Sequence, residues 1–570
     1  MRLTIPPIAF SILTAFAQAS PPPPAELVLR NGKIVTLDPA APLAQALAAR
    51  GGRIVAVGSN GAVGPFIGPQ TQVIDLHGML AIPGFIEGHG HFTGLGEYHL
   101  GLDLRGARDW DAIVAQVVDA VKRAKPGEWI VGRGWHQSKW DRAPSPNVEG
   151  FPLHASLSRI SPDNPVMLTH ASGHAAFVNA AAMRAAGITR ATVNPAGGEI
   201  LKDSQGEPTG LLRETAEGLA TGAYSRWRDL RPAADRLAEL RRVIDLASTE
   251  CLSKGITTFE DAGSSLAVAD VFRSMARNSQ LRLRLWVMLS GSDPGVETSL
   301  DRYRTVGEGR DRLTIRAIKH YMDGALGSRG AWLIEPYADK PDSRGFNVED
   351  PAEIRKAAEL AIQHGYQLCV HAIGDRANRE TLDIYEEAFR AHPDKTDLRW
   401  RIEHAQHLSA ADIPRFGKLG VIAAMQGVHC TSDAPFVIER LGAERAQEGA
   451  YVWRKLLDSG AVVGNGTDTP VEDVSPLACF YASVTRRPKG GEPFYPDQRM
   501  TREEALRSYT LSNAYAAFEE KLKGSLEPGK LADVTVLSRD ILTIPEDQIL
   551  STEVAYTIVD GRIAWQRAGR

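Results

Sequence analysis

Eight short strand-like runs, separated by helical segments, constrain the fold of this chain most strongly. Each run is apolar and ends in polar residues, and together they cover residues 80–92, 256–263, 283–289, 313–324, 367–375, 398–406, 420–429 and 461–468. Helical patterns stand between several of them, at residues 235–255, 351–365, 376–392 and 448–460. Alternation of this kind predicts an α/β fold, and eight βα repeats predict a TIM-type (β/α)8 barrel with parallel strands.

One interval in this pattern is too long for a single repeat. Residues 93–255 separate the first two strand-like runs, whereas a βα unit needs only a few tens of residues. Residues from about 95 to 225 are therefore predicted to form an α/β insertion after the first barrel strand. Such an insertion lies beside the C-terminal face of the barrel, where it can serve as a lid or as a wall of the substrate pocket.

Both ends of the chain are rich in β-type sequence. Residues 25–82 and 521–570 contain short strands with turn signals, among them Asn31-Gly32 and Asp560-Gly561, which are typical of hairpins. A small β-sandwich built jointly from both ends explains this pattern, with residues 83–520 as the barrel domain. The alternative is two independent small sheets, which would be marginally stable alone.

The first 19 residues are typical of a secretory signal peptide. Arg2 precedes an apolar stretch from Ile8 to Phe16, and Ala17-Gln18-Ala19 fits the cleavage pattern. A cleaved leader predicts a periplasmic or secreted protein, and an uncleaved one a cytoplasmic protein. The four cysteines form no CxxC pair, so no disulfide framework is expected.

Composition excludes several classes of partner. The chain has 570 residues, 43% of them hydrophobic, and a net charge of −4, which gives no electrostatic footprint for nucleic acid. No apolar run reaches the roughly 18 residues that span a bilayer. The expected partner is therefore a small-molecule substrate. The oligomeric state is open, with a homodimer as the commonest symmetric assembly.

In a barrel of this type, chemistry takes place at the C-terminal ends of the strands. The first run ends in His89-Gly90-His91, and alternate residues of a strand point to the same side, so both imidazoles can bind one divalent metal ion. Alone this motif is a weak signal. Other strand ends supply further ligands or bases, namely Lys319, His371, His404 and Asp468. Their joint occurrence in order along the chain is far more specific than any one of them.

Four further residues are weaker candidates for the substrate pocket. Trp135 and His174 lie in the insertion, Arg329 follows the fourth strand and His429 follows the seventh. Each could face a substrate, and each could instead be a packed or surface residue.

Many stretches of the chain resemble one family. They include "NGKIVTLD", "AIPGFIEGHGHF", "GRGWHQSKW", "SGHAAFVNAAAM", "MDGALGSRGAW", "HAIGDRAN", "RIEHAQ", "MQGVHCTSD", "GTDTPVEDVSP" and "GSLEPGKLADVTVL". On these the sequence resembles the amidohydrolase superfamily, and more narrowly its YtcJ-like, amidohydrolase-3 branch, which includes N-substituted formamide deformylases. The resemblance covers nearly the whole chain after the leader and implies a barrel with a β-sandwich.

The resemblance also implies a set of site residues. His89 and His91 would bind a first divalent metal ion, and His371 and His404 a second. Lys319 would be carbamylated and bridge the two ions, which Zn²⁺, Mn²⁺, Fe²⁺ or Co²⁺ could supply, Zn²⁺ being the expected metal. Asp468 would bind the first ion and act as the catalytic proton shuttle. A metal-activated hydroxide would then cleave a non-peptide C–N bond, in an amide or N-formyl group.

Three alternatives to this reading stay open. The same site could hydrolyse a lactone, an ester or a carbamate. A ring deaminase is a second possibility, although the resemblance ties such enzymes to one metal ion and no bridging lysine, so Lys319 argues against it. A binding protein that keeps an inactive barrel is the third, and the complete set of potential ligands argues against it.

Overall fold

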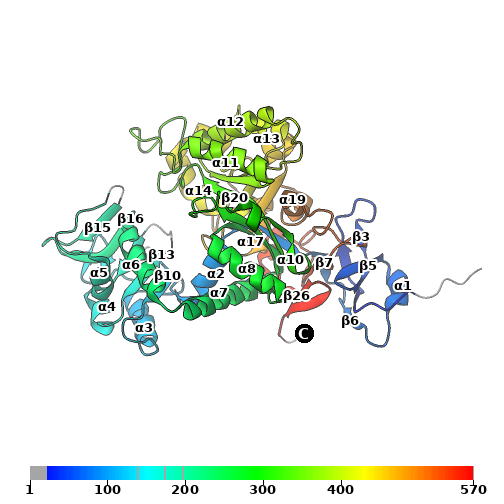
Figure 1. Ribbon diagram of the computed structural model, residues 1–570, viewed down its shortest axis with the longest axis horizontal. Coiled ribbons are helices and arrows are strands. Elements are labelled where there is room, and N and C mark those ends of the chain that lie inside the picture. Colours follow the sequence, from blue (N-terminus) through cyan, green and yellow to red (C-terminus); the bar gives the residue numbers. More distant parts are fainter. Residues whose placement is uncertain (1–21, 138–139, 172–174, 196–197, 569–570) are drawn as a thin grey trace, which may run out of the picture.

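The computed structural model describes residues 22–568 apart from 138–139, 172–174 and 196–197. Its centre is a nine-stranded sheet, of which eight parallel strands curve into a barrel and one short strand, β19 (Thr305–Gly307), pairs antiparallel at its side (Figure 1). In chain order the barrel strands are β8 (Phe85–Gly90), β17 (Ile256–Ser264), β18 (Arg284–Ser290), β20 (Leu313–Tyr321), β21 (Gln367–Ala372), β22 (Arg401–His404), β23 (Ile422–Gln426) and β24 (Val463–Gly466). All eight predicted runs supply a strand, and the predicted fold class is confirmed.

Helices surround the barrel and cover its hydrophobic core. They are α2 (Phe92–Leu100), α7 (Ala233–Ser253), α8 (Leu266–Arg277), α11 (Pro351–His364), α12 (Asp375–Ala391), α13 (Ile413–Leu419), α14 (Gly427–Leu441), α15 (Ala443–Gly449), α16 (Trp453–Asp458), α17 (Pro476–Thr485), α18 (Arg502–Ser508) and α19 (Leu511–Ala516). The single helix predicted at 448–460 is wrong in one respect. Tyr451 has a left-handed backbone (φ 54°), which a continuous helix cannot contain, so α15 and α16 are separate.

The first predicted strand is in fact two strands in two different sheets. β7 (Leu80–Pro83) belongs to a sheet formed by the chain ends, and β8 begins the barrel directly after Gly84. A Cβ atom at Gly84 would lie 2.3 Å from Oγ1 of Thr257 on β17, so only glycine fits where the chain passes from one sheet to the other.

The junction between β8 and β24 closes the barrel, and much of it is held by a side chain. The Nδ2 group of Asn513 in α19 donates to the carbonyl oxygens of Ile86 and Asn465, at 2.8 Å each, and its Oδ1 accepts from Asn465 N at 3.2 Å. Beyond this amide, Asp468 N donates to the carbonyl oxygen of His89 at 2.8 Å. The Asn513 side chain thus occupies the place of a backbone ladder between the first and last strands.

The two ends of the chain form a pair of sheets on one side of the barrel (Figure 1). One sheet has the order β5 (Arg53–Gly58), β4 (Ala46–Arg50), β1 (Leu27–Arg30), β6 (Gln72–Asp75). The other has the order β27 (Arg562–Gln566), β26 (Val554–Val559), β25 (Val534–Leu537), β7, β2 (Lys33–Val35), β3 (Leu43–Ala44). β25 pairs antiparallel with β7, and apolar residues of both sheets share one core. The sandwich is therefore built jointly from both ends.

The two predicted hairpins have different outcomes. Asp560 and Gly561 (φ 53° and 65°) join the antiparallel strands β26 and β27, so this hairpin is confirmed. The hairpin at Asn31-Gly32 is wrong, because β1 and β2 belong to different sheets. Asn31 Nδ2 donates to Asp75 Oδ2 at 2.6 Å, and this contact holds the turn in a crossing between the sheets.

The insertion forms its own sheet on the opposite side of the barrel (Figure 1). The strand order is β15 (Gly198–Lys202), β16 (Pro208–Glu214), β14 (Ala175–Val178), β13 (Val166–His170), β10 (Ile130–Trp135), β9 (Leu102–Asp103). Helices α3 (Trp110–Val121), α4 (Ala155–Ile160), α5 (Ala180–Ala186) and α6 (Glu217–Leu230) accompany it. Two separate hydrophobic cores lie within this unit.

Two predictions from the sequence concern membrane-spanning segments and export. Within the described part of the chain, none of the helices has the length and apolar character needed to cross a membrane. The predicted leader, residues 1–19, lies outside the described residues, so export stays a prediction. All four cysteines are described, buried and unpaired.

Candidate active site

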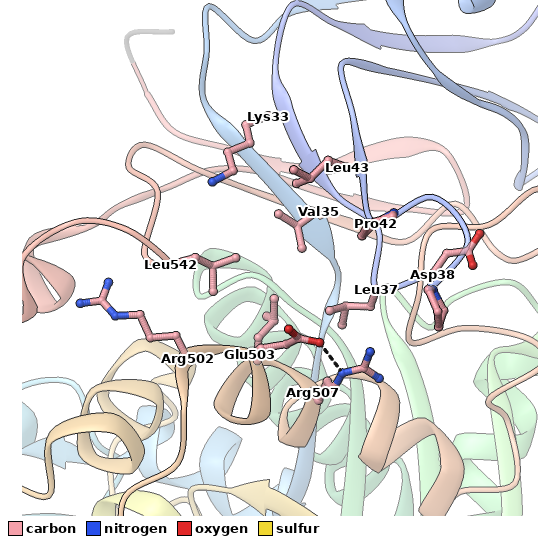
Figure 2. Close-up of a pocket in the computed structure, with 12 residues that line it drawn as sticks. Lys33, Val35, Leu37, Asp38, Pro42, Leu43, Arg502, Glu503, Arg507 and Leu542 are labelled. Carbon is pink, nitrogen blue, oxygen red and sulfur yellow. Dashed lines mark hydrogen bonds and ion pairs between the residues drawn. The ribbon is translucent and has the colours of Figure 1, made fainter.

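Two cavities are candidates for the active site. The first, about 470 Å³, lies between β2 and α18, and Figure 2 shows Lys33 and Val35 facing Arg502 and Glu503 across it. Its described lining contains neither histidine nor cysteine. Several of its charged groups already have partners, because Lys33 pairs with Asp540 at 2.5 Å and Glu503 with Arg507 at 3.0 Å. This cavity offers no set of convergent catalytic groups.

The second cavity, about 630 Å³, lies at the C-terminal ends of the barrel strands. It is lined by apolar residues such as Leu326 and Phe436 and by four polar residues, His371, His404, His429 and Asp468. An apolar cavity with a few convergent polar groups at this face of a barrel is the usual form of an active site.

One group of donors comes from the junction between β8 and β24. His89 Nε2 lies 3.5 Å and His91 Nε2 3.2 Å from Asp468 Oδ1. The ligand atoms of the three residues all lie within 4.8 Å of one another. The close pairing of β8 with the loop after β24 therefore places three of the predicted site residues around one point.

A second group shares the same aspartate. The ligand atoms of His404, His429 and Asp468 also lie within 4.8 Å of one another, with His429 Nε2 3.9 Å from Asp468 Oδ2. His371 is adjacent, its ring centroid 4.4 Å from that of His404, but its nitrogens belong to neither group. The resemblance had paired His404 with His371, whereas here His429, predicted only as a pocket residue, lies with His404 and Asp468.

Lys319 lies beneath these groups on β20. Its side chain is buried, and its ammonium group lies 4.2 Å from the centre of the Tyr321 ring. Among the described residues it makes no ion pair, with Asp323 or any other carboxylate. The neighbouring His320 points the other way and contacts Glu349 Oε2 at 2.6 Å. Lys319 is therefore buried beside three histidines. Burial and the Lys319 charge lower the pKa values of His371 and His404, whereas Glu403 and Asp468 raise the pKa of His89 against both effects.

A buried charge network supports His89, and sequence reasoning missed it. His89 Nδ1 donates to Glu403 Oε2, and Arg401 holds Glu403 through Nε at 2.7 Å and Nη2 at 2.9 Å. Arg401 also pairs with Glu260 and donates to the Gly88 carbonyl at 2.7 Å. Because Nδ1 of His89 is the donor, its Nε2 lone pair is left free on the side of Asp468. The alternation in "RIEH" could have shown that Arg401 and Glu403 share one side of β22.

Gln426 holds His404 in a similar way, and Asp323 lies beside His371. His404 Nδ1 donates to Gln426 Oε1 at 2.7 Å, which again leaves Nε2 free to act as a ligand. Asp323 accepts hydrogen bonds from the amides of Ile373 and Gly374, at 2.9 and 2.8 Å, and lies 3.6 Å from His371 Nε2. His89 and His404 therefore each have a polar residue that fixes the ring, whereas Asp323 approaches His371 without a hydrogen bond to its Nε2.

Two of the donor residues have strained backbones. His404 (φ 75°) and Asp468 (φ 58°) both occupy the left-handed region, which residues other than glycine and asparagine rarely adopt. Such conformations cost of order 1–3 kcal/mol each and persist where the surroundings determine them. The strain turns the chain at the ends of β22 and β24, where both side chains meet the cavity.

The surroundings of the site lower the pKa values of one histidine and two carboxylates. Burial and the Lys319 cation lower the pKa of His371 to about 3, so it is neutral at pH 7. Burial alone would raise the pKa of Glu403, but Arg401 and His89 outweigh it and hold that pKa at about 2. In the same way His89 and His91 outweigh burial at Asp468 and lower its pKa well below the usual range.

Several donor atoms at the site lack a partner. Nε2 of His89, His371 and His429 and Oδ1 of Asp468 are buried, and none makes a hydrogen bond with the described residues. Unsatisfied buried polar atoms are costly, so a group of four at the C-terminal strand ends calls for a ligand. Imidazole nitrogens and carboxylate oxygens together suit Zn²⁺ and similar divalent ions, so the residues present fit a metal site.

The predicted pocket residues are placed differently from one another. His429 lines the cavity. Trp135 does not reach it, because its ring is 1% exposed in the core of the insertion and its Nε1 donates to the Leu168 carbonyl at 2.8 Å. Arg329 is likewise outside the lining and pairs with Asp339 at 2.5 Å. His174 lies outside the described residues.

Replacing Glu403 tests whether this carboxylate holds the His89 ring in place. We expect Glu403→Gln to lower metal affinity or turnover about 10- to 100-fold, because the neutral amide holds the His89 ring and its tautomer less firmly. Glu349→Gln is the matched control, since it alters the same kind of contact at His320, outside the cavity. Metal titration of both variants checks this expectation, and equal affinities would show that Glu403 has no such role.

Fold and site together define a barrel enzyme in which histidines and a carboxylate converge at the C-terminal strand ends. A model of the amidohydrolase family matches residues 72–564, and the chain belongs to this family. It is accordingly a hydrolase that acts on carbon–nitrogen bonds. The resemblance found in the sequence is confirmed.

Known proteins resemble the chain over nearly its whole length. It is 35% identical over 529 residues to the Arabidopsis thaliana protein LONG AFTER FAR-RED 3, covering 90% of this chain and 87% of that protein. It is 29% identical over 553 residues to the N-substituted formamide deformylase of Arthrobacter pascens, covering 95% and 99%. The crystal structure of an uncharacterised metal-dependent hydrolase from Pyrococcus horikoshii has a TM-score of 0.74 and 27% identity, covering 91% and 99%.

Proposed function

We propose that this protein is a metal-dependent hydrolase that cleaves a non-peptide C–N bond in an amide or N-formyl group. The observation that carries the proposal is the set of buried histidine and aspartate ligand atoms without hydrogen bonds at the strand ends. A relative that covers 95% of the chain and is named as an N-substituted formamide deformylase supports the choice of bond.

Six residues would hold two divalent ions, for which we propose Zn²⁺. They are His89, His91, Lys319, His371, His404 and Asp468, and His429 lies close enough to join them. A bound divalent ion would supply a Lewis acid for the substrate carbonyl and would lower the pKa of a water molecule. Lys319 is a buried cation in this structure, and carbamylation by CO₂ would convert it into an anionic ligand with carboxylate-like oxygens.

Asp468 is the residue suited to move the proton. It stands between the two groups of donors, and its oxygens face His89, His91 and His429. From this position its carboxylate can take a proton from the attacking water and deliver it to the leaving nitrogen. The products would be a carboxylic acid, which is formate for an N-formyl substrate, and an amine.

Hydrolysis of a lactone, an ester or a carbamate by the same residues is the alternative, because each has a carbonyl carbon that water attacks. Turnover of matched amide and ester substrates distinguishes the two. A ring deaminase would release ammonia from amino-substituted heterocycles, so these are tested as a separate set of substrates.

Metal analysis of the protein and of Lys319→Ala tests the proposal. We expect about two ions per chain in the wild type and one or none in the variant, because a bridging ligand is shared by both ions. His320→Ala is the matched control, since it removes the neighbouring side chain that points away from the cavity. Its metal content should equal that of the wild type.

Turnover is then measured on N-formyl and N-acyl amines before and after chelation. Hydrolysis that stops with chelator and returns with added Zn²⁺ would support the proposal. One ion in both proteins would remove the carbamate from it and favour a site with a single metal. No ion in either protein would contradict it altogether.

A further inference from the structure

The cavity at the strand ends continues outward into a second one. This outer cavity, about 450 Å³, lies between the barrel and the insertion, and the two share lining residues Ala171, Ser432, Val471 and Glu472. Its remaining walls come from α2, from β10 of the insertion and from the loop after β24. The two cavities therefore form one continuous cleft that leads away from the candidate metal ligands.

The inner part of this cleft is acidic. Apart from its histidines, the charged residues among its described lining are Asp433, Asp468 and Glu472, with no lysine or arginine beside them. Asp433 and Glu472 would repel a negative charge on the substrate segment that lies beside them, whereas bound divalent ions would offset this repulsion at the scissile bond itself. The segment between the scissile bond and the outer cavity is therefore expected to be neutral.

The outer part contains two arginines, and only one of them already has a partner. Arg105 pairs with Asp103 through Nε at 2.9 Å and Nη2 at 2.7 Å. The guanidinium group of Arg133 makes no hydrogen bond or ion pair with any described residue. A guanidinium group has five N–H donors in a planar fork that matches a carboxylate. Arg133 thus offers an unused binding group in the wall of the cleft.

Local structure explains why Arg133 faces the cleft. Along β10, Ile130 packs into one core of the insertion and Val131 packs against the other, so alternation places Arg133 on the side of Val131. Gly134 (φ 104°) then interrupts the pairing of β10 with β13, and this bulge turns Trp135 back to the core that contains Ile130. The side chain of Arg133 is thereby held in the wall of the cleft.

The charge of Arg133 acts within the catalytic region. Burial lowers the pKa of its guanidinium group, and the groups that oppose this shift are Tyr98, Glu217 and Asp468. A desolvated cation that lacks a full ion pair binds an anionic ligand group strongly. The interaction with Asp468 also places this cation within electrostatic reach of the proton shuttle.

From this geometry we infer that Arg133 binds a carboxylate at the end of the substrate that is remote from the scissile bond. The inference rests on the proposed hydrolysis of an amide and specifies its substrate class. These substrates are amides with a neutral, apolar segment next to the C–N bond and a carboxylate at the far end. The inner cavity accepts the apolar segment and Arg133 the carboxylate.

Matched substrate pairs test the inference. The probes are N-formyl-ω-amino acids of increasing chain length and the corresponding ω-carboxamides, which keep the shape and remove the charge. At the best length, Arg133→Gln should lower kcat/KM for the acid about 10- to 100-fold, mainly through KM, because a charge-assisted hydrogen bond is lost. It should lower kcat/KM for the carboxamide far less than for the acid, and Arg133→Lys should recover part of the loss.

Arg105→Gln is the control, because it removes a second arginine from the same wall that is already paired with Asp103. It should not change the preference for the acid. Equal kcat/KM for acid and carboxamide in the wild type, or an equal loss for both in Arg133→Gln, would overturn the inference.

Calorimetric binding of the same pairs separates this inference from the proposed function. If the wild type binds the acid more tightly than the carboxamide and Arg133→Gln abolishes the difference, the inference stands even when neither compound is hydrolysed. If both compounds are hydrolysed without any preference, the proposed function stands and the inference fails.

Discussion

Asp468→Asn is expected to abolish hydrolysis almost completely while leaving the fold intact. Loss of a positioned general base costs about 10²- to 10⁴-fold in rate, and Asp468 is also a shared member of both donor groups. We therefore expect a loss of turnover of about 10³-fold or more. Asparagine tolerates the left-handed backbone at this position (φ 58°), so the change removes the charge without breaking the turn.

Formate release from an N-formyl substrate and the thermal unfolding midpoint of the same preparation provide the measurement. Asp458→Asn is the matched control, because it makes the same chemical change at a carboxylate on α16 that is 65% exposed and lines neither part of the cleft. It should retain activity. Activity of Asp468→Asn within about tenfold of the wild type would exclude Asp468 as the proton shuttle.

Arg401→Met should have the largest effect on stability. Arg401 is fully buried and holds two carboxylates, Glu260 and Glu403, within the barrel. Methionine fills much of the same volume but leaves both carboxylates without their cation. Breaking a buried pair in this way costs about 3–5 kcal/mol in the free energy of unfolding.

Guanidinium unfolding, followed by the fluorescence of the buried tryptophans, measures this cost. Arg355→Met is the control, because the pair between Arg355 and Glu387 is exposed (45% and 60%) and should contribute less than about 1 kcal/mol. Similar losses in both variants would show that the network beneath His89 is not a special source of stability.

The sequence predicted the barrel well because the signal for each strand is local. All eight runs are apolar, end in polar residues and alternate with helices, and each supplies a barrel strand. The signal failed where tertiary contacts decide the outcome. Asn31-Gly32 and Asp560-Gly561 look alike as dipeptides, but only the second joins two strands of one sheet, because Asn31 is bound to Asp75 and its flanking strands pair elsewhere.

The same division applies to the candidate site. Residues that stand at strand ends, such as His89, His404 and Asp468, could be found by asking what each strand carries to the C-terminal face. Glu403 and Gln426 could not be assigned in this way, because their roles depend on contacts between different strands. Trp135 was predicted as a pocket residue, but the bulge at Gly134 turns its side chain into the core of the insertion. No local sequence pattern predicts that bulge.

The Asn513 bridge between the first and last barrel strands has a consequence for the order in which the protein is made. Asn513 is translated more than four hundred residues after Ile86, the β8 residue that it binds. Until α19 has left the ribosome, the nascent chain lacks the amide that joins β8 to β24. His89 and Asp468 flank this junction, so an incomplete chain contains the potential metal ligands but not the bridge that brings them together.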